Sequence, residues 1–241
     1  MEINKSNYTY DSVSEVTDTD SSRKYLAKVF TWMFVALGVS AATAYVFFTN
    51  LSLLNLIVGP TGFTGIGYAV LFAPLAFSLV INFGFNRISY IGMVGLFMGY
   101  AVSIGITISI LGLIYTSGSM FTVFLSAAVV FAIMAAAGYY TQQDLTKFGT
   151  ILYTVFIGVF VVGLINFFMK SAQLDYIISI VFVILMIGLT SYYMQMLKRI
   201  GAGIEFGKEE SKKLVIIGAF ILYTTFINLF MSLLRIFGNR R

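Results

Sequence analysis

The sequence has no cysteine, no histidine and only two prolines among its 241 residues, and charged residues make up just 10% of it. Without cysteine the chain has no disulfide, no thiolate nucleophile and no zinc–thiolate site. Without histidine it lacks the commonest metal ligand, the commonest general base and the side chain that most often titrates near neutral pH.

Apolar residues take the place of the missing charges. They make up 59% of the chain, against about 45–50% in an ordinary globular protein, where charged residues reach about 25%. A soluble protein of this length could not cover its surface with so few charges. The composition therefore excludes a water-soluble enzyme, a disordered chain and a nucleic-acid binder, and it makes the lipid bilayer the expected partner.

Five long uncharged stretches divide the chain. The first two, which run from Lys28 to Arg87 and from Arg87 to Asp144, hold 58 and 56 residues between their ends. Three shorter stretches of 22, 22 and 21 residues follow. A helix that spans the bilayer needs about 20 apolar residues, so each long stretch accommodates two helices and each shorter one accommodates a single helix. The sequence thus predicts an all-α, polytopic membrane protein with seven transmembrane helices.

Turn-forming residues place the loops inside the two long stretches, around Gly59–Gly65 and around Tyr115–Ser119. The runs lack the alternation of polar and apolar residues that barrel strands show. The expected spans are 27–49, 67–85, 90–114, 120–140, 149–169, 175–197 and 214–236. Residues 1–25 are rich in Ser, Thr, Asn and Asp and have no apolar run, so we interpret them as a disordered soluble tail before a transmembrane domain of residues 26–241.

The distribution of Lys and Arg predicts the orientation. With seven crossings, eleven basic residues lie on the side of the N-terminus and four on the other side, which places the N-terminus in the cytoplasm. The pair Arg240-Arg241 then lies outside, against the rule, unless the last segment re-enters. The four basic residues on the outer side are Lys170, Arg235, Arg240 and Arg241.

No constellation of catalytic residues lies within the predicted spans. All ten acidic residues fall outside the helical cores, which excludes an aspartyl intramembrane protease and argues against a proton pump. A serine protease with a histidine partner is excluded as well, and the chain has no Walker loop and no dinucleotide fingerprint. We expect no enzymatic activity, no metal and no cofactor.

Small and polar residues within the spans suggest packing faces or a solute path. Gly95 and Gly99 form a G-x-x-x-G pattern that continues to Ser103 at the same spacing, typical of close helix packing. Thr225 and Asn228 share a helix face, and Asn166 is a further polar residue in an apolar span. Such residues either bond between helices or line a path for a solute. Arg87, at a predicted boundary, either extends to the headgroups or serves such a path.

A set of short motifs resembles the Bax inhibitor family, the transmembrane Bax inhibitor motif proteins. The run from Gly138 to Gly149, GYYTQQDLTKFG, resembles the family signature after the fourth helix. Other matches follow the family order from about residue 25 to the C-terminus: Lys28–Met33, Gly105–Ser109, Tyr115–Ser119, Leu164–Phe168, Phe226–Phe230 and Leu233–Arg235.

The resemblance implies a bacterial member of this family, with six helices around a central seventh, in the cytoplasmic membrane. It also implies a leak of cations, chiefly calcium, into the cytoplasm. Family members carry one aspartate in the sixth helix and one in the seventh, thought to share a proton and gate the pore. Here Tyr193 and Thr225 stand at those positions, while Arg87 aligns with a basic residue near that gate.

Two functions follow as expectations. The first is a calcium or cation leak with altered or absent pH gating by the aspartate pair, with Arg87, Tyr193, Thr225, Asn228 and Asn166 as pore or gate candidates. The second is a non-conducting membrane protein that regulates partners such as membrane proteases or stress factors.

Overall fold

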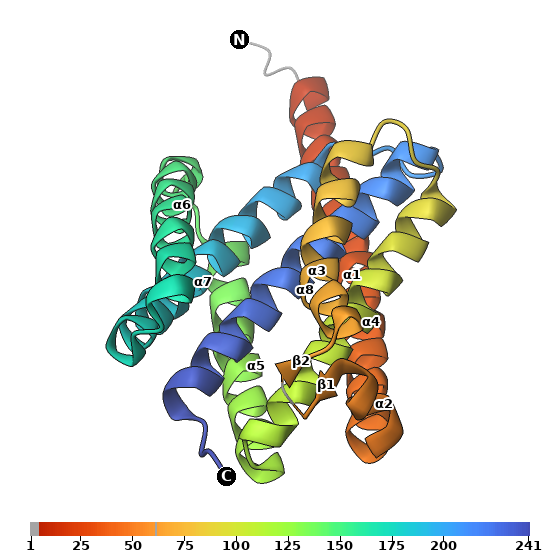
Figure 1. Cartoon of the computed structure of the whole chain (residues 1–241). Coiled ribbons are helices and arrows are strands. Elements are labelled where there is room, and N and C mark those ends of the chain that lie inside the picture. Colours follow the sequence, from red (N-terminus) through yellow and green to blue (C-terminus); the bar gives the residue numbers. More distant parts are fainter. Residues whose placement is uncertain (1–4, 61) are drawn as a thin grey trace.

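The computed structural model describes residues 5–60 and 62–241, with side chains from residue 20 onward (Figure 1). Helices dominate the described part, and one two-stranded antiparallel hairpin pairs Val58 with Phe63. The elements are α1 (Lys5–Thr49), α2 (Leu51–Ile57), β1 (Val58–Gly59), β2 (Gly62–Phe63), α3 (Gly65–Gly84), α4 (Tyr90–Ile114), α5 (Ser117–Tyr140), α6 (Thr146–Met169), α7 (Ala172–Ala202) and α8 (Glu209–Phe237).

Seven of the described helices are long and apolar enough to cross a membrane: α1 from Asp20, then α3 to α8. This confirms the expected number, and each observed helix overlaps one expected span. Helices suit such segments because every backbone group must be satisfied within the lipid. Side-chain oxygens of the residues before four of these helices accept a backbone N–H of the first turn and so mark where each helix begins; these residues are Thr64, Ser89, Thr116 and Ser171.

The helix α1 extends into the stretch expected as a soluble tail. Its described part runs from Lys5, and neither proline nor glycine interrupts the sequence before Gly38. Ser22 and Tyr25 are buried, and the Tyr25 hydroxyl donates a hydrogen bond to the Leu214 carbonyl at 3.0 Å. The packed domain therefore begins before residue 26. Residues 1–4 of the expected tail lie outside the described residues.

The seventh transmembrane helix, α8, lies at the centre, which confirms the expected architecture. In its most apolar 18-residue window 67% of the residues are buried, the largest share among the seven spans. It packs against α1, α4, α5 and α7. Edge-to-face aromatic pairs line its contacts, such as Phe226 with Phe131 at 5.6 Å and Phe220 with Tyr100 at 4.9 Å. A helix surrounded in this way has little contact with lipid, so its polar residues face protein or an internal cavity.

The last segment crosses the whole bundle and does not re-enter. At its start, the Glu209 carboxylate accepts a hydrogen bond from the Tyr90 backbone N–H at the beginning of α4. At its end, the Asn239 N–H donates to the Ser119 hydroxyl and the Arg241 N–H donates to the Ile114 carbonyl, where α4 ends. Because α8 has 29 residues, or about 43 Å at about 1.5 Å per residue, it is longer than the hydrocarbon core of about 30 Å. The two ends of α8 therefore lie on opposite sides of the bundle, as Figure 1 also shows.

Helix packing along α4 departs from the expected glycine pattern. A methyl group at Gly95 would meet no atom within 4 Å, so Gly95 is not on a packing face. At Gly99 it would meet the Phe77 ring at 2.9 Å, and at Gly105 it would meet the Ser40 carbonyl oxygen at 2.6 Å. Ser103 is buried, and its hydroxyl bonds back to the Tyr100 carbonyl within α4. Among the glycines of α4, only Gly105 thus lies against the backbone of another helix, α1, and the pattern-based assignment of Gly95 is corrected.

Candidate functional site

A polar cavity of about 290 Å³ lies between α3, α6, α7 and α8. The apolar parts of its wall include Phe156 and Phe220. None of the described residues that line it carries a charge. Its polar wall consists of hydroxyl and amide groups, contributed by Ser78, Asn82, Tyr153, Tyr193, Thr224, Thr225 and Asn228.

The fold brings three of the sequence-predicted gate candidates together at this cavity. Tyr193 reaches it from α7, and Thr225 and Asn228 reach it from the central helix α8. The Tyr193 hydroxyl donates a hydrogen bond to the Tyr153 hydroxyl of α6 at 3.1 Å. The Thr225 hydroxyl donates to the Ile221 carbonyl at 2.8 Å, so its oxygen lone pairs remain available as acceptors.

Arg87 and Asn166 do not line this cavity. Arg87 is exposed in the turn between α3 and α4, where its backbone N–H donates to the Gly84 carbonyl. Asn166 is buried near the end of α6, and its side-chain oxygen accepts the Ser171 backbone N–H at 3.1 Å. This hydrogen bond satisfies a backbone N–H where the chain turns from α6 into α7, so the contacts of Asn166 are those of a capping residue.

A second cluster, which the sequence reasoning missed, fastens the loop between α5 and α6. Gln195 of α7 is buried, and it accepts the Leu145 backbone N–H and donates to the Gln143 carbonyl, at 2.9 and 2.7 Å. One turn further along α7, Arg199 donates to the Asp144 carboxylate at 2.8 Å. Lys198 donates to the Tyr139 carbonyl at 2.9 Å. The spacing of Gln195 and Arg199 on one helix face was the available signal.

The charge of Asp144 is stabilised by this arrangement. Hydrogen bonds from the Thr146 side chain, from Arg199 and from the Thr146 backbone lower the pKa of the Asp144 carboxyl from 3.8 to about 2. Its carboxylate is exposed at the loop surface. The residue is thus ionised throughout the physiological range and acts as a constant anchor for Arg199.

Two glycines, one on each side of this loop, allow α5 and α6 to approach α7. A methyl group at Gly138 would clash with the backbone of Ser191, and one at Gly149 would clash with the Tyr192 ring. The Ser191 hydroxyl, beside this crossing, donates to the Met134 carbonyl at 2.8 Å. These contacts give a physical reason for glycine at both ends of the run from Gly138 to Gly149.

The seven crossings, the buried central helix and the uncharged polar cavity define a multi-pass integral membrane protein. The sequence profile of the family described as "Inhibitor of apoptosis-promoting Bax1" matches residues 22–241. The chain therefore belongs to the Bax inhibitor family.

Similar proteins are found in several bacteria. The chain is 36% identical over 218 residues to the inner membrane protein YbhL of Escherichia coli K12, covering 90% of this chain and 92% of that protein. It is 34% identical over 225 residues to the protein RP147 of Rickettsia prowazekii, with 93% of each covered. It is 30% identical over 218 residues to the membrane protein SpyM3_0260 of Streptococcus pyogenes, with 90% and 93% covered.

Proposed function

We propose that this protein is a cation leak, with calcium as its chief permeant ion, and that ions pass through the polar cavity between α3, α6, α7 and α8. The observation that carries the proposal is that Tyr193, Thr225 and Asn228 meet at one cavity beside the central helix. Hydroxyl and amide oxygens are hard ligands of the kind that calcium and other hard cations accept in place of water. The proposal includes no enzymatic step.

The cavity chemistry makes such a leak insensitive to pH near neutrality. A pair of close carboxylates would share a proton and titrate as a unit. In this chain Tyr193 and Thr225 occupy the positions where the family resemblance implies those carboxylates. Neither side chain ordinarily titrates between about pH 5 and 8, and the chain has no histidine. The proposed leak is therefore open or closed for reasons other than protonation of this cavity.

One observation favours the rival function, a non-conducting regulator of membrane-protein partners. The Tyr193 hydroxyl donates to the Tyr153 hydroxyl at 3.1 Å, so a large side chain stands at one of the two carboxylate positions and pairs with a second tyrosine in the cavity wall. A cavity blocked in this way would conduct no ions. The membrane partners of a regulator would then meet lipid-facing surfaces such as α6, which packs against α7 and exposes apolar side chains, Phe160 and Phe167 among them.

We also propose that the protein lies in the bacterial cytoplasmic membrane with its N-terminus in the cytoplasm. The distribution of eleven and four basic residues supports this orientation. The name of the Escherichia coli relative, an inner membrane protein, supports the location. The loop between α5 and α6 is then cytoplasmic, together with the Arg199–Asp144 pair.

Calcium flux into vesicles that contain the purified full chain tests the leak. We expect flux above that of protein-free vesicles, and we expect Thr225→Val, which removes one cavity oxygen at nearly constant size, to reduce it several-fold. Thr107→Val is the matched control, because the Thr107 hydroxyl bonds back within its own helix just as the Thr225 hydroxyl does but does not line the cavity. Flux equal to that of empty vesicles would refute the leak in favour of the regulator. Equal effects of the two variants would remove this cavity from the path.

A further inference from the structure

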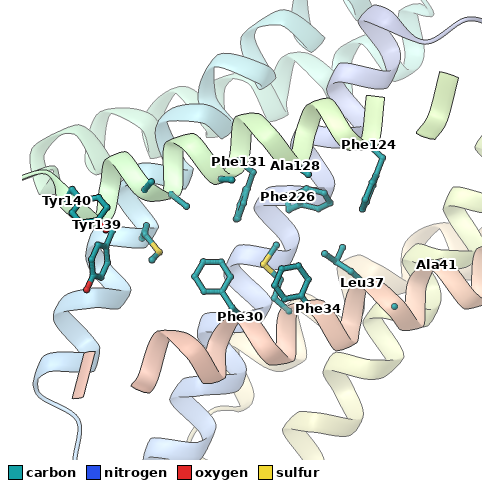
Figure 2. Close-up of a pocket in the computed structure, with 16 residues that line it drawn as sticks. Phe30, Phe34, Leu37, Ala41, Phe124, Ala128, Phe131, Tyr139, Tyr140 and Phe226 are labelled. Atoms are coloured by element: carbon teal, nitrogen blue, oxygen red, sulfur yellow. The ribbon is translucent and has the colours of Figure 1, made fainter. Parts of the chain in front are cut away.

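A deep apolar groove of about 660 Å³ runs between α1 and α5 (Figure 2). Figure 2 shows the α1 side chains facing those of α5 across it, with two tyrosines at one end. Its floor is formed by Met194 of α7 and Phe226 of α8. Its walls include Phe30, Phe34 and Leu37 of α1 and Ala128, Phe131 and Ala132 of α5.

The groove opens sideways from the bundle. Phe34 on its rim is 65% exposed and Tyr140 at its end is 77% exposed. In a membrane-spanning bundle, such side chains face lipid. α1 packs instead against α4, α7 and α8, and α5 packs against α7 and α8, so these two helices flank the groove without closing it. The groove is therefore accessible from the hydrocarbon of the bilayer.

The dimensions of the groove suit a single flexible chain. Its α5 wall extends from Phe124 to Tyr140, about 24 Å of helix at about 1.5 Å per residue. A lipid acyl chain is narrower than a helix, which is about 10 Å wide with its side chains. A chain of that kind suits a groove of this length with a volume of about 660 Å³.

The mouth of the groove carries groups that suit a phosphate. Arg23 lies on the same face of α1 as Phe30 and Phe34, seven and eleven residues earlier, and thus about 10 Å before Phe30 along the helix. Its side chain is exposed there and lies close to Tyr139. The Lys198 ammonium group lies 4.6 Å from the centre of the Tyr139 ring.

Two cations, Arg23 and Lys198, therefore lie beside Tyr139, at the end of the groove nearest the α5–α6 loop. The carboxylate of Asp20 is also near, and it pairs with Lys24 at 3.3 Å. Tyrosine is enriched at the level of the headgroups, and Arg binds phosphate through charge-assisted hydrogen bonds. The charge at this end is complementary to an anionic headgroup.

We propose that the α1–α5 groove is a binding site for an anionic phospholipid of the leaflet that faces the α5–α6 loop. One acyl chain lies along Phe30, Phe34 and Phe131, and the phosphate lies between Arg23 and the two tyrosines. The bound lipid completes the contact between α1 and α5 that the protein alone leaves open. This site shares no lining residue with the polar cavity, although α7 and α8 border both.

Native mass spectrometry of the full chain tests the proposal. The protein is mixed in detergent with equal amounts of phosphatidylglycerol and phosphatidylcholine that carry the same acyl chains. We expect one retained lipid, with phosphatidylglycerol preferred. Ala132→Trp fills the groove and should reduce retention by about tenfold, equivalent to about 1.4 kcal/mol. Ala137→Trp is the matched control, because Ala137 is exposed on the same helix but does not line the groove.

The headgroup contact has its own variant pair. Arg23→Gln should lower the preference for phosphatidylglycerol several-fold while phosphatidylcholine is still retained. Lys147→Gln, which removes an exposed charge near the same loop but outside the groove, should leave the preference unchanged. An unchanged preference in Arg23→Gln would overturn the assignment of the phosphate.

Three other outcomes would overturn the site itself. These are a wild-type chain without retained lipid, equal loss in Ala132→Trp and Ala137→Trp, and a dimer that Ala132→Trp alone disrupts, which would make a second copy the occupant. A phospholipid with a photoreactive acyl chain provides a test on the unmodified protein. We expect its crosslinks on the α1 and α5 segments around Phe34 and Ala132, and crosslinks confined to other helices would refute the groove as the binding site.

Discussion

Alanine substitutions at three glycines of α4 should have different effects, because the three sites face different surroundings. At Gly105 an added methyl group would lie 2.6 Å from the Ser40 carbonyl oxygen and 2.7 Å from the Thr43 Cβ, both on α1. At Gly99 it would meet only the Phe77 ring, at 2.9 Å. At Gly95 it would meet no atom within 4 Å. Backbone cannot rotate away as a side chain can, so the cost should be greatest at Gly105.

The expected magnitudes follow from two opposing terms. Replacing a helical glycine with alanine stabilises the helix by about 0.5–1 kcal/mol. Overpacking a close contact costs about 1–3 kcal/mol. Gly95→Ala has only the first term and should stabilise the protein, whereas in Gly105→Ala the second term dominates. Gly99→Ala should lie between the two, because the Phe77 ring can shift.

Thermal unfolding in detergent measures the order of the three variants. A change of about 1 kcal/mol corresponds to about 2–4 °C in Tm for a chain of about 150–250 residues. We therefore expect Gly95→Ala to unfold a few degrees above wild type and Gly105→Ala a few degrees below it. All variants are heated at one scan rate, since membrane proteins often unfold irreversibly. Equal shifts for Gly95→Ala and Gly105→Ala would show that α4 does not cross α1 at Gly105.

Three further outcomes are expected. Asp144 has a pKa of about 2 in the folded chain, so its contribution to stability is present above its ordinary pKa of about 4 and is lost as the pH falls through about 2. Wild type should therefore have a higher Tm than Asp144→Asn at pH 6, and the difference should disappear near pH 2; a constant difference would contradict this linkage. Calcium flux through the wild type should vary little from about pH 5 to 8, whereas Tyr193→Asp combined with Thr225→Asp should make it pH-dependent, and a steep response of the wild type would place the sensor elsewhere. Because the native chain has no cysteine, single cysteines at Ser117 and Ser211 should react with an impermeant reagent from opposite sides of the membrane, and reaction of both from one side would refute the topology.

The number and order of the transmembrane helices could be predicted from the sequence. The spacing of charges between Lys28 and Arg235 is enough, because charged groups are costly within lipid and a helix must satisfy its own backbone there. The motif from Gly138 to Gly149 indicated the family, because it is a continuous run of residues that can be compared without knowing the fold. Both features lie along the chain and do not depend on which helices become neighbours.

The faces of the helices could not be predicted in the same way. In a soluble protein, a polar stripe shows which side of a helix faces water. Here the spans are apolar on most sides, so the sequence pattern does not reveal how each helix is rotated about its axis. Gly95 and Gly105 therefore look alike in the sequence, although only Gly105 meets a neighbouring backbone.

The site depended on the same tertiary information. Tyr193, Thr225 and Asn228 were selected from the sequence, and it is the packing of α7 against the central α8 that places them around one cavity. Arg87 and Asn166 were selected with them, but the fold leaves Arg87 exposed in a turn and uses Asn166 to cap the end of α6. Length and hydrophobicity thus determine how often this chain crosses the membrane. Which polar groups meet is decided only by the rotation and close contact of the helices. Rotation and contact depend on how the side chains of residues far apart in the sequence fit together.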